Sequence, residues 1–134
     1  MDNTITLKDY ILYSGNLFKC IFKRTTILQA KVQSFDIGDI IKDRIIKMME
    51  ELINDTLTLE METKLEYPSG FPHSTYWGEV RMYIDKYRTH PWQMYKECRE
   101  RLGNGIYAAF VLYYARGLQE DLQCLEGWAQ QVRI

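Results

Sequence analysis

The strongest constraint on the fold is an apolar stripe that begins near Ile106 and continues almost to the end of the chain. Apolar residues recur along it every three or four positions: Tyr107, Val111, Tyr114, Leu118, Leu122, Leu125, Ala129 and Val132. This spacing places them on one side of a helix. The first half of this segment is apolar nearly all round, whereas the second half carries Gln and Glu on its outer side. We therefore predict a long helix whose first half is buried in a core or an interface.

Two further segments have helical spacing. In residues 36–53 one face is apolar and the other is charged, with Ser34 or Asp36 as the N-terminal cap and Asn54-Asp55 as the stop. In residues 92–102 a helix is expected to follow the cap Thr89 and an early Pro91, and to end at Gly103-Asn104-Gly105.

The N-terminal segment, residues 4–23, allows two interpretations. Leu7, Tyr10, Ile11 and later apolar residues follow helical spacing, and Thr6 is suitably placed as a cap. Ser14-Gly15-Asn16, however, stands between two runs rich in Ile, Tyr, Phe and Leu, which is typical of two short strands and a turn. We predict the hairpin here, and residues 25–34 receive no assignment.

Residues 56–67 and 77–88 alternate between apolar and polar side chains, which predicts two strands with one solvated face each. Residues 67–74, rich in Pro and Gly, would connect them in a second hairpin. A helical alternative exists for each, through Ile53, Leu57, Met61 and Leu65 in the first, and through Trp77, Val80, Ile84 and Tyr87 in the second.

Together these elements predict a single small α+β domain over residues 1–134, with two β-hairpins, one central helix and two C-terminal helices. The alternative is a mainly α fold, in which residues 56–88 are helical as well. The length of 134 residues is typical of one domain.

Composition excludes several classes of protein. With 46% hydrophobic residues and a net charge of −1, from 17 basic and 18 acidic residues, the chain is neither disordered nor coated with positive charge. The uncharged run 106–115 is far shorter than the roughly 20 residues that a membrane span needs. The start of the chain lacks signal-peptide features, and three widely spaced cysteines do not suit a disulfide framework. We therefore expect a cytoplasmic protein with free thiols.

The sequence contains no pattern that predicts catalysis, a cofactor or a metal. The two histidines, His73 and His90, lie outside any nucleophile motif, and the cysteines lack the close spacing of zinc ligands. Residues 103–108 match G-x-G-x-x-A, but a charged helical pattern precedes them instead of a strand. We expect a connector between helices at this position, and no enzyme.

Charge is unevenly distributed along the chain. Residues 50–66 hold six acids and one lysine, and Glu60, Glu62 and Glu66 would share one face of the predicted strand. That face is interpreted mainly as solvated, with electrostatic docking as the alternative.

Residues 81–101 are basic, with six cations against three acids, and are interleaved with aromatic residues. Tyr, Trp and Arg anchor protein interfaces, and the same composition suits single-stranded nucleic acid. The candidate binding residues are Arg81, Tyr83, Tyr87, Arg88, Trp92, Tyr95, Lys96 and Arg99.

We therefore expect a non-catalytic protein-binding protein, such as an inhibitor, an immunity-type or anti-defence protein, or an assembly subunit, which acts by surface complementarity. The partner would be another protein, or a second copy in a homo-oligomer, with no membrane contact. The alternative is nucleic-acid binding through residues 81–101, and the third hypothesis is a small enzyme without a recognisable motif.

Overall fold

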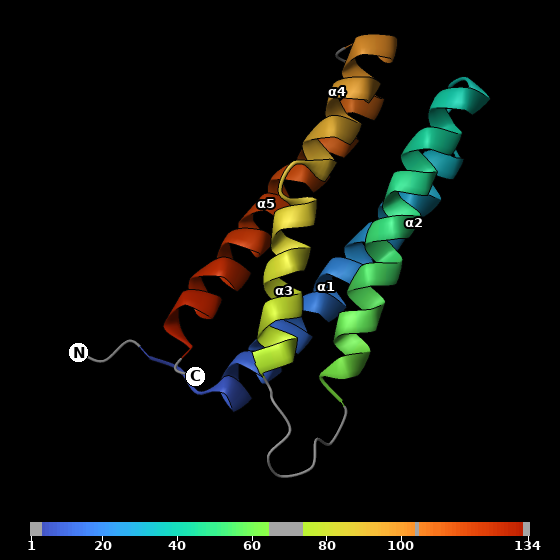
Figure 1. Ribbon diagram of the computed structural model, residues 1–134. Helices are drawn as coiled ribbons and strands as arrows, with labels where there is room; N and C mark the ends of the chain where they lie inside the picture. Colours follow the sequence, from blue (N-terminus) through green and yellow to red (C-terminus); the bar gives the residue numbers. More distant parts are fainter. Residues whose placement is uncertain (1–3, 65–73, 104, 133–134) are drawn as a thin grey trace.

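The computed structural model describes residues 4–64, 74–103 and 105–132, and these are helical almost throughout (Figure 1). The described helices are α1 (Leu7–Gln33), α2 (Asp39–Glu62), α3 (Ser74–Tyr87), α4 (His90–Leu102) and α5 (Ile106–Gln131). The only β-type pairing within the described ranges is an isolated bridge between Ile5 and Val132. The predicted α+β fold with two hairpins is therefore wrong, and the mainly α alternative is confirmed.

The helices form a bundle in which α1 packs beside α2, and α4 packs beside α5. α1 contacts α2 and α5, while α3 and α4 follow one another along the space between α2 and α5 (Figure 1). α3 and α4 thus make one column, opposite α1. This column is interrupted at Arg88 and Thr89, because the ring of Pro91 would clash with a helical carbonyl four residues earlier and lacks the N–H donor that would bond to it.

The N-terminal hairpin is replaced by the continuous helix α1. Thr6 caps it by accepting a hydrogen bond from the Asp9 N–H at 3.0 Å. Gly15, predicted to lie in a turn, is buried inside the helix, where a Cβ would lie 2.9 Å from Oγ1 of Thr63 beyond the end of α2. The glycine therefore permits close packing between two parts of the chain and does not mark a turn.

The two predicted strands are helical as well. In α2 the hydroxyls of Thr56 and Thr58 donate to the carbonyls of Leu52 and Asn54, four residues earlier, so threonine does not force a strand there. Leu57 is 38% exposed, so the apolar alternation does not mark a buried face. The remainder of that alternation, with Glu66 and the connecting loop that contains His73, lies outside the described residues.

The second strand, 77–88, coincides with α3. Its buried residues Tyr76, Val80, Tyr83, Ile84 and Tyr87 follow helical spacing, which agrees with the helical alternative.

The other helix predictions hold with shifted ends. α4 ends at Leu102 before Gly103, whose positive φ of 75° is one that glycine adopts readily because it has no Cβ. α5 begins at Ile106 as expected. α2 starts later than predicted, after Gly38. It continues past the expected stop at Asn54-Asp55, and both residues are helical and lie on its outer side.

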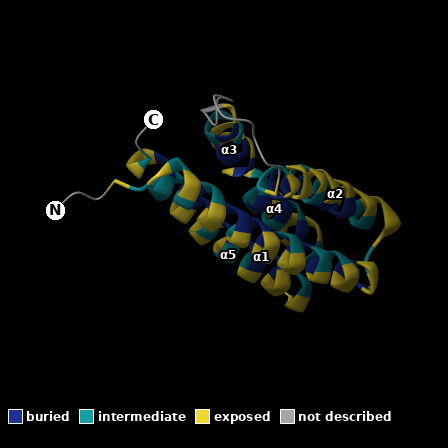
Figure 2. Cartoon of the chain, turned by 90° about the horizontal axis from the view of Figure 1, so that it is seen from below, coloured by how far each residue is buried: buried dark blue, intermediate teal, exposed yellow. Residues whose placement is uncertain are grey.

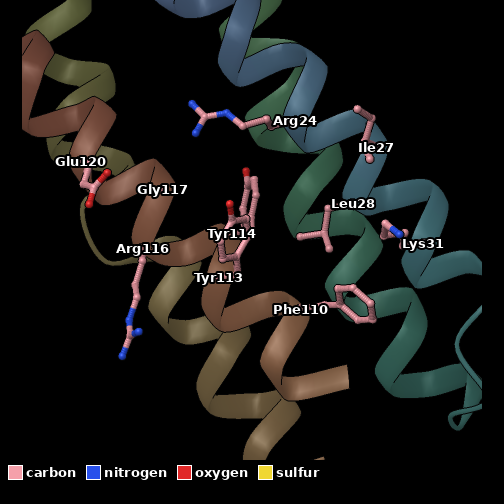
Figure 3. Close-up of a pocket in the computed structure, with 10 residues that line it drawn as sticks. All are labelled: Arg24, Ile27, Leu28, Lys31, Phe110, Tyr113, Tyr114, Arg116, Gly117 and Glu120. Carbon is pink, nitrogen blue, oxygen red and sulfur yellow. The ribbon is translucent and has the colours of Figure 1, made fainter. Parts of the chain in front are cut away.

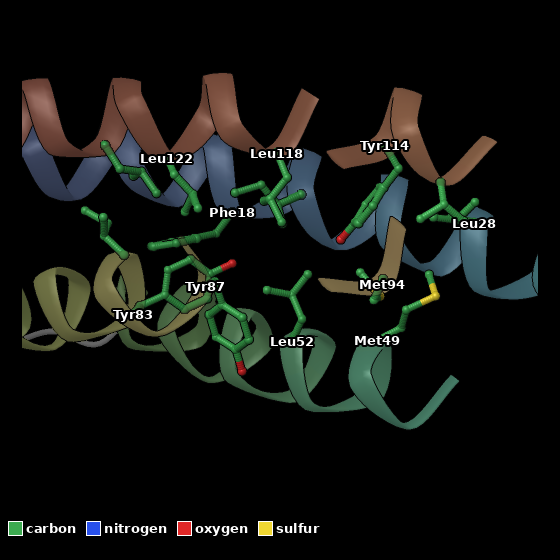
Figure 4. Packing of buried hydrophobic residues seen from close by; sticks show 14 of the residues in the cluster. Phe18, Leu28, Met49, Leu52, Tyr83, Tyr87, Met94, Tyr114, Leu118 and Leu122 are labelled. Carbon is green, nitrogen blue, oxygen red and sulfur yellow. The ribbon is translucent and has the colours of Figure 1, made fainter. Parts of the chain in front are cut away.

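The core lies along the centre of the bundle, with the exposed residues on its outside (Figures 2 and 4). Buried side chains from each described helix contribute, among them Phe18, Met49, Leu52, Tyr83, Met94 and Leu118. Full burial of such side chains stabilises the fold by about 1.5–3 kcal/mol each.

Within the described core, three buried Tyr hydroxyls pair with a Ser or Thr of another helix. The pairs are Ser14–Tyr76 at 2.5 Å, Thr25–Tyr114 at 2.7 Å and Thr56–Tyr83 at 2.7 Å. Each Ser or Thr hydroxyl already donates to the carbonyl four residues earlier in its own helix. Its single proton is thereby used, so the tyrosine is the donor. These bonds fix the relative heights of the helices, because a slip would leave buried polar groups unpaired.

Candidate functional site

Two of the predicted binding residues lie in the core. Tyr83 and Tyr87 are 4% and 0% exposed. The Tyr83 hydroxyl donates to Thr56, and the Tyr87 hydroxyl donates to the Asp55 carboxylate. Burial raises the pKa of both phenols, which keeps them neutral donors. Their rings therefore serve packing, and neither is presented to a partner.

The other six predicted residues lie at the surface but are divided between α3, the residue that follows it, and α4. Arg88 bridges Asp85 and Glu126 at 3.3 and 3.2 Å, and Arg81 lies over the Trp77 ring at 4.9 Å. These two arginines line a shallow hollow against α5. Contact of these six residues with a partner stays a prediction.

On α4, Trp92 and Tyr95 are half-buried, whereas Lys96 and Arg99 are exposed. Tyr95 and Arg99 line a second hollow, beside the start of α5. Residues of the segment 81–101 therefore line several separate hollows and do not form one continuous site.

A larger hollow, of about 560 Å³, lies between α1 and α5 (Figure 3). We call it the α1–α5 groove. It is lined by Arg24, Ile27, Leu28 and Lys31 of α1 and by Phe110, Tyr113, Tyr114, Arg116, Gly117 and Glu120 of α5. Within each helix most of these residues are three or four positions apart, so each helix presents one side to the groove.

Apolar side chains in this groove are unusually exposed. Tyr113 is 84% exposed, Ile27 49% and Phe110 37%. Leu28 and Tyr114, by contrast, are buried and connect the groove to the core. Single exposed apolar residues are common on proteins, but a group of them around a hollow marks a binding surface.

The floor of the groove is neutral and already hydrogen-bonded. The Tyr114 hydroxyl donates to Thr25, and burial raises the pKa of this phenol. The floor therefore offers no acid or base for a reaction. What it provides is a fixed apolar surface below the exposed side chains.

Positive charge surrounds the apolar part. Arg24, Lys31 and Arg116 stand against two carboxylates, Glu120 in the lining and Asp121 beside Arg24, which leaves an excess of one positive charge. Arg24 also forms an ion pair with Asp121. The Lys31 ammonium lies 5.0 Å from the centre of the Phe110 ring, within the range of a cation–π contact.

Gly117 makes room for this arrangement. A Cβ at position 117 would lie 3.0 Å from Nη1 of Arg24, so any larger residue would push the guanidinium aside. The glycine thus leaves Arg24 free to lie across α5 and reach Asp121. The groove therefore keeps both an apolar centre and a charged wall.

Sequence reasoning missed the groove because no residues in α1 beyond position 23 were assigned a structure. One feature of the sequence did indicate the groove. The start of α5 is apolar nearly all round, whereas packing against a core requires only one apolar face. The spacing of Arg24, Ile27 and Lys31 becomes meaningful once α1 is known to pack beside α5.

Other chemistry-bearing residues have structural surroundings. His90 contacts the Met48 carbonyl at 2.9 Å and links the start of α4 to α2. The cysteines at 20, 98 and 124 are free, and burial raises the pKa of the Cys98 thiol. In the part of the chain that the structure describes, no three His, Cys, Asp or Glu side chains converge as a metal site would require.

No protein family matches the chain, and no curated protein or solved structure is significantly similar to it. Across the described residues, none of the helices combines the length and apolar character that would let it cross a lipid bilayer.

Proposed function

We propose that this chain is a non-catalytic protein-binding protein whose α1–α5 groove holds an acidic, amphipathic helix of a partner. One observation carries the proposal: exposed Ile27, Phe110 and Tyr113 surround a hollow that is rimmed by excess positive charge. Helices bind such grooves by placing apolar side chains three or four positions apart into the hollow. Acidic residues beside that stripe would meet Arg24, Lys31 and Arg116.

A helical protein segment suits the groove better than nucleic acid does. Nucleic-acid surfaces combine cations with aromatic faces that are free to stack on bases. In this groove Lys31 already covers the Phe110 ring, which is therefore not free to stack on a base. The segment 81–101, predicted from sequence to bind a protein with nucleic acid as the alternative, has Tyr83 and Tyr87 in the core. A reducing compartment such as the cytoplasm, where the free thiols would persist, is part of the proposal.

Binding of a designed peptide tests the proposal. The probe is a fluorescein-labelled helical peptide with Leu at positions i, i+3, i+4 and i+7 and Glu elsewhere. Its matched control has Lys in place of every Glu. The chain is titrated at concentrations at which gel filtration shows the 16.0 kDa monomer, and binding is followed by fluorescence anisotropy. We expect the Glu peptide to bind at least tenfold more tightly than the Lys peptide.

Variants locate the binding surface. Tyr113→Glu should weaken binding of the Glu peptide by at least tenfold, as expected for a central anchor of about 2 kcal/mol. Ile40→Glu changes an equally exposed apolar residue, 75% exposed on α2, and should bind like the wild type. Equal binding of both peptides, or an unchanged affinity in Tyr113→Glu, would contradict binding of an acidic helix in the groove.

A further inference from the structure

A second exposed apolar surface lies on the other side of the bundle. Because α1 and the α3–α4 column are opposite one another, the junction of α2 with α3 faces away from the α1–α5 groove (Figure 2). A hollow of about 350 Å³ at this junction is lined by Asp55, Thr58, Leu59, Glu62, Glu79, Met82, Tyr83 and Lys86. Without the buried Tyr83, and together with its exposed neighbours Leu57 and Met61, we call this set the α2–α3 face.

The α2–α3 face presents flexible apolar side chains to solvent. Met82 is 72% exposed, Met61 57% and Leu57 38%. Methionine adapts its shape to irregular surfaces and is enriched where proteins bind one another. The face therefore offers flexible apolar side chains that could fill the hollow of the groove.

The charge of this face is opposite to that of the groove. Lys86 is already engaged, at 2.7 Å from Glu51 and 2.9 Å from Asp55. Glu62 and Glu79 lie against each other, and neither forms an ion pair with any described residue. Glu62 and Glu79 share a hydrogen bond, so the pair carries less than two full negative charges, but no cation neutralises it. Its charge is thus opposite in sign to the excess positive charge of the groove.

We infer that the α2–α3 face of one copy docks into the α1–α5 groove of the next, so that the chain assembles head to tail. This inference rests on the proposed function and names a second copy of the chain as the partner. Exposed Met61 and Met82 would enter the apolar hollow of the groove, while Glu62 and Glu79 would meet its cations.

The geometry determines the kind of assembly. The groove is formed by the C-terminal half of α1, and the α2–α3 face by the C-terminal half of α2. Because α1 and α2 run in opposite directions, these two surfaces lie towards opposite ends of the bundle (Figure 1). Contacts between two different surfaces do not close as a two-fold dimer does, and they produce a ring or a staggered filament.

Two single variants test the inference, because each blocks one of the two docking surfaces. Tyr113→Glu disrupts only the groove, and Met82→Lys disrupts only the α2–α3 face. We expect the mass of the wild type in light scattering to rise above 16.0 kDa with concentration, while each variant stays at 16.0 kDa. An equimolar mixture of the variants should form dimers of twice that mass and nothing larger, since each contributes one intact surface.

Controls keep the result interpretable. Both substituted residues are strongly exposed, so circular dichroism and thermal melting should show the wild-type fold. Ile40→Lys, at another exposed apolar site, should assemble as the wild type does. A wild type that remains at 16.0 kDa, variants that assemble unchanged, or a mixture that does not dimerise would each overturn head-to-tail assembly.

The same variants separate this inference from the proposed function. Met82→Lys has an intact groove that no second copy occupies, so it should bind the Leu/Glu peptide as tightly as the monomeric wild type. If it binds the peptide while the wild type never assembles, the groove function stands and self-assembly is wrong. If it neither binds the peptide nor dimerises with Tyr113→Glu, both proposals fail.

Discussion

The two sides of α1 differ in how closely they pack. Towards α2, the absence of a side chain at Gly15 lets Thr63 approach the α1 backbone. Towards α5, the C-terminal half of α1 borders a hollow with large exposed side chains on both walls. Close packing contributes stability, whereas exposed apolar area costs solvation and persists where a partner covers it. We infer that the α1–α2 side maintains the fold and that the α1–α5 side binds.

The largest expected contrast is between an aromatic residue in the core and one in the groove. Phe18 is fully buried, with its ring 5.2 Å from that of Tyr83. Phe18→Ala should reduce the free energy of unfolding by about 3–5 kcal/mol. Tyr113→Ala, at a position 84% exposed, should change it by less than about 0.5 kcal/mol. Urea denaturation measures both, and similar losses would mean that the groove is part of the folding core.

The buried hydroxyl pairs provide a second contrast. Thr56→Val removes the acceptor of the Tyr83 hydroxyl, which is then buried without a partner at a cost of about 1–3 kcal/mol. Adding Tyr83→Phe removes the unpaired group and should restore part of that loss. A double-mutant cycle in urea measures the coupling. Additive losses would show that the pair does not fix the helices relative to each other.

Glycine substitutions compare close and open packing directly. At Gly15 a new methyl group would lie 2.9 Å from Oγ1 of Thr63, so Gly15→Ala should destabilise by about 1 kcal/mol despite the better helix propensity of alanine. Gly127, also helical, has open space around its Cβ position. Gly127→Ala should therefore stabilise by about 0.5–1 kcal/mol. Thermal melting of both variants checks the opposite signs.

The smallest expected effect concerns pH. Burial, with the hydrogen bond and charge of Glu79, raises the pKa of Glu62 from 4.5 to about 7. The folded state therefore holds this proton more tightly than the unfolded chain does. The resulting stability is complete below pH 4.5 and is lost as the pH rises through about 7.

Glu62→Gln removes this titration. The variant should lose less stability than the wild type between pH 5 and pH 8, by about 1 kcal/mol or less, because solvent screens this half-buried carboxyl. Glu50→Gln, at an exposed carboxyl of the same helix, should retain the wild-type slope. Urea denaturation across this range gives the comparison, and parallel profiles for Glu62→Gln and wild type would contradict it.

Sequence reasoning succeeded where the deciding interactions are local. The α5 stripe, the start of α4 before Pro91 and its end at Gly103 depend on residues within one or two turns. It failed where a distant contact decides. The close approach that explains Gly15 comes from Thr63, and Thr56 and Thr58 tolerate a helix because their hydroxyls bond back to it.

The candidate site follows the same division. Tyr83 and Tyr87 were predicted to bind because aromatic residues interleave with cations over residues 81–101, whereas the helix turns both into the core. The groove requires the pairing of α1 with α5, which no local pattern contains. The only available indication was that the start of α5 is apolar nearly all round. This predicts burial in a core or an interface, but it does not identify the partner.

Photocrosslinking from the groove tests the central claim most directly. Tyr113 is replaced by the photoreactive residue p-benzoylphenylalanine, and the irradiated protein is digested and analysed by mass spectrometry. We predict intermolecular crosslinks from position 113 to the α2–α3 face, centred on Met61 and Met82. The same residue at position 40 should not produce them. Absence of these crosslinks from position 113, or equal crosslinking from position 40, would contradict the account.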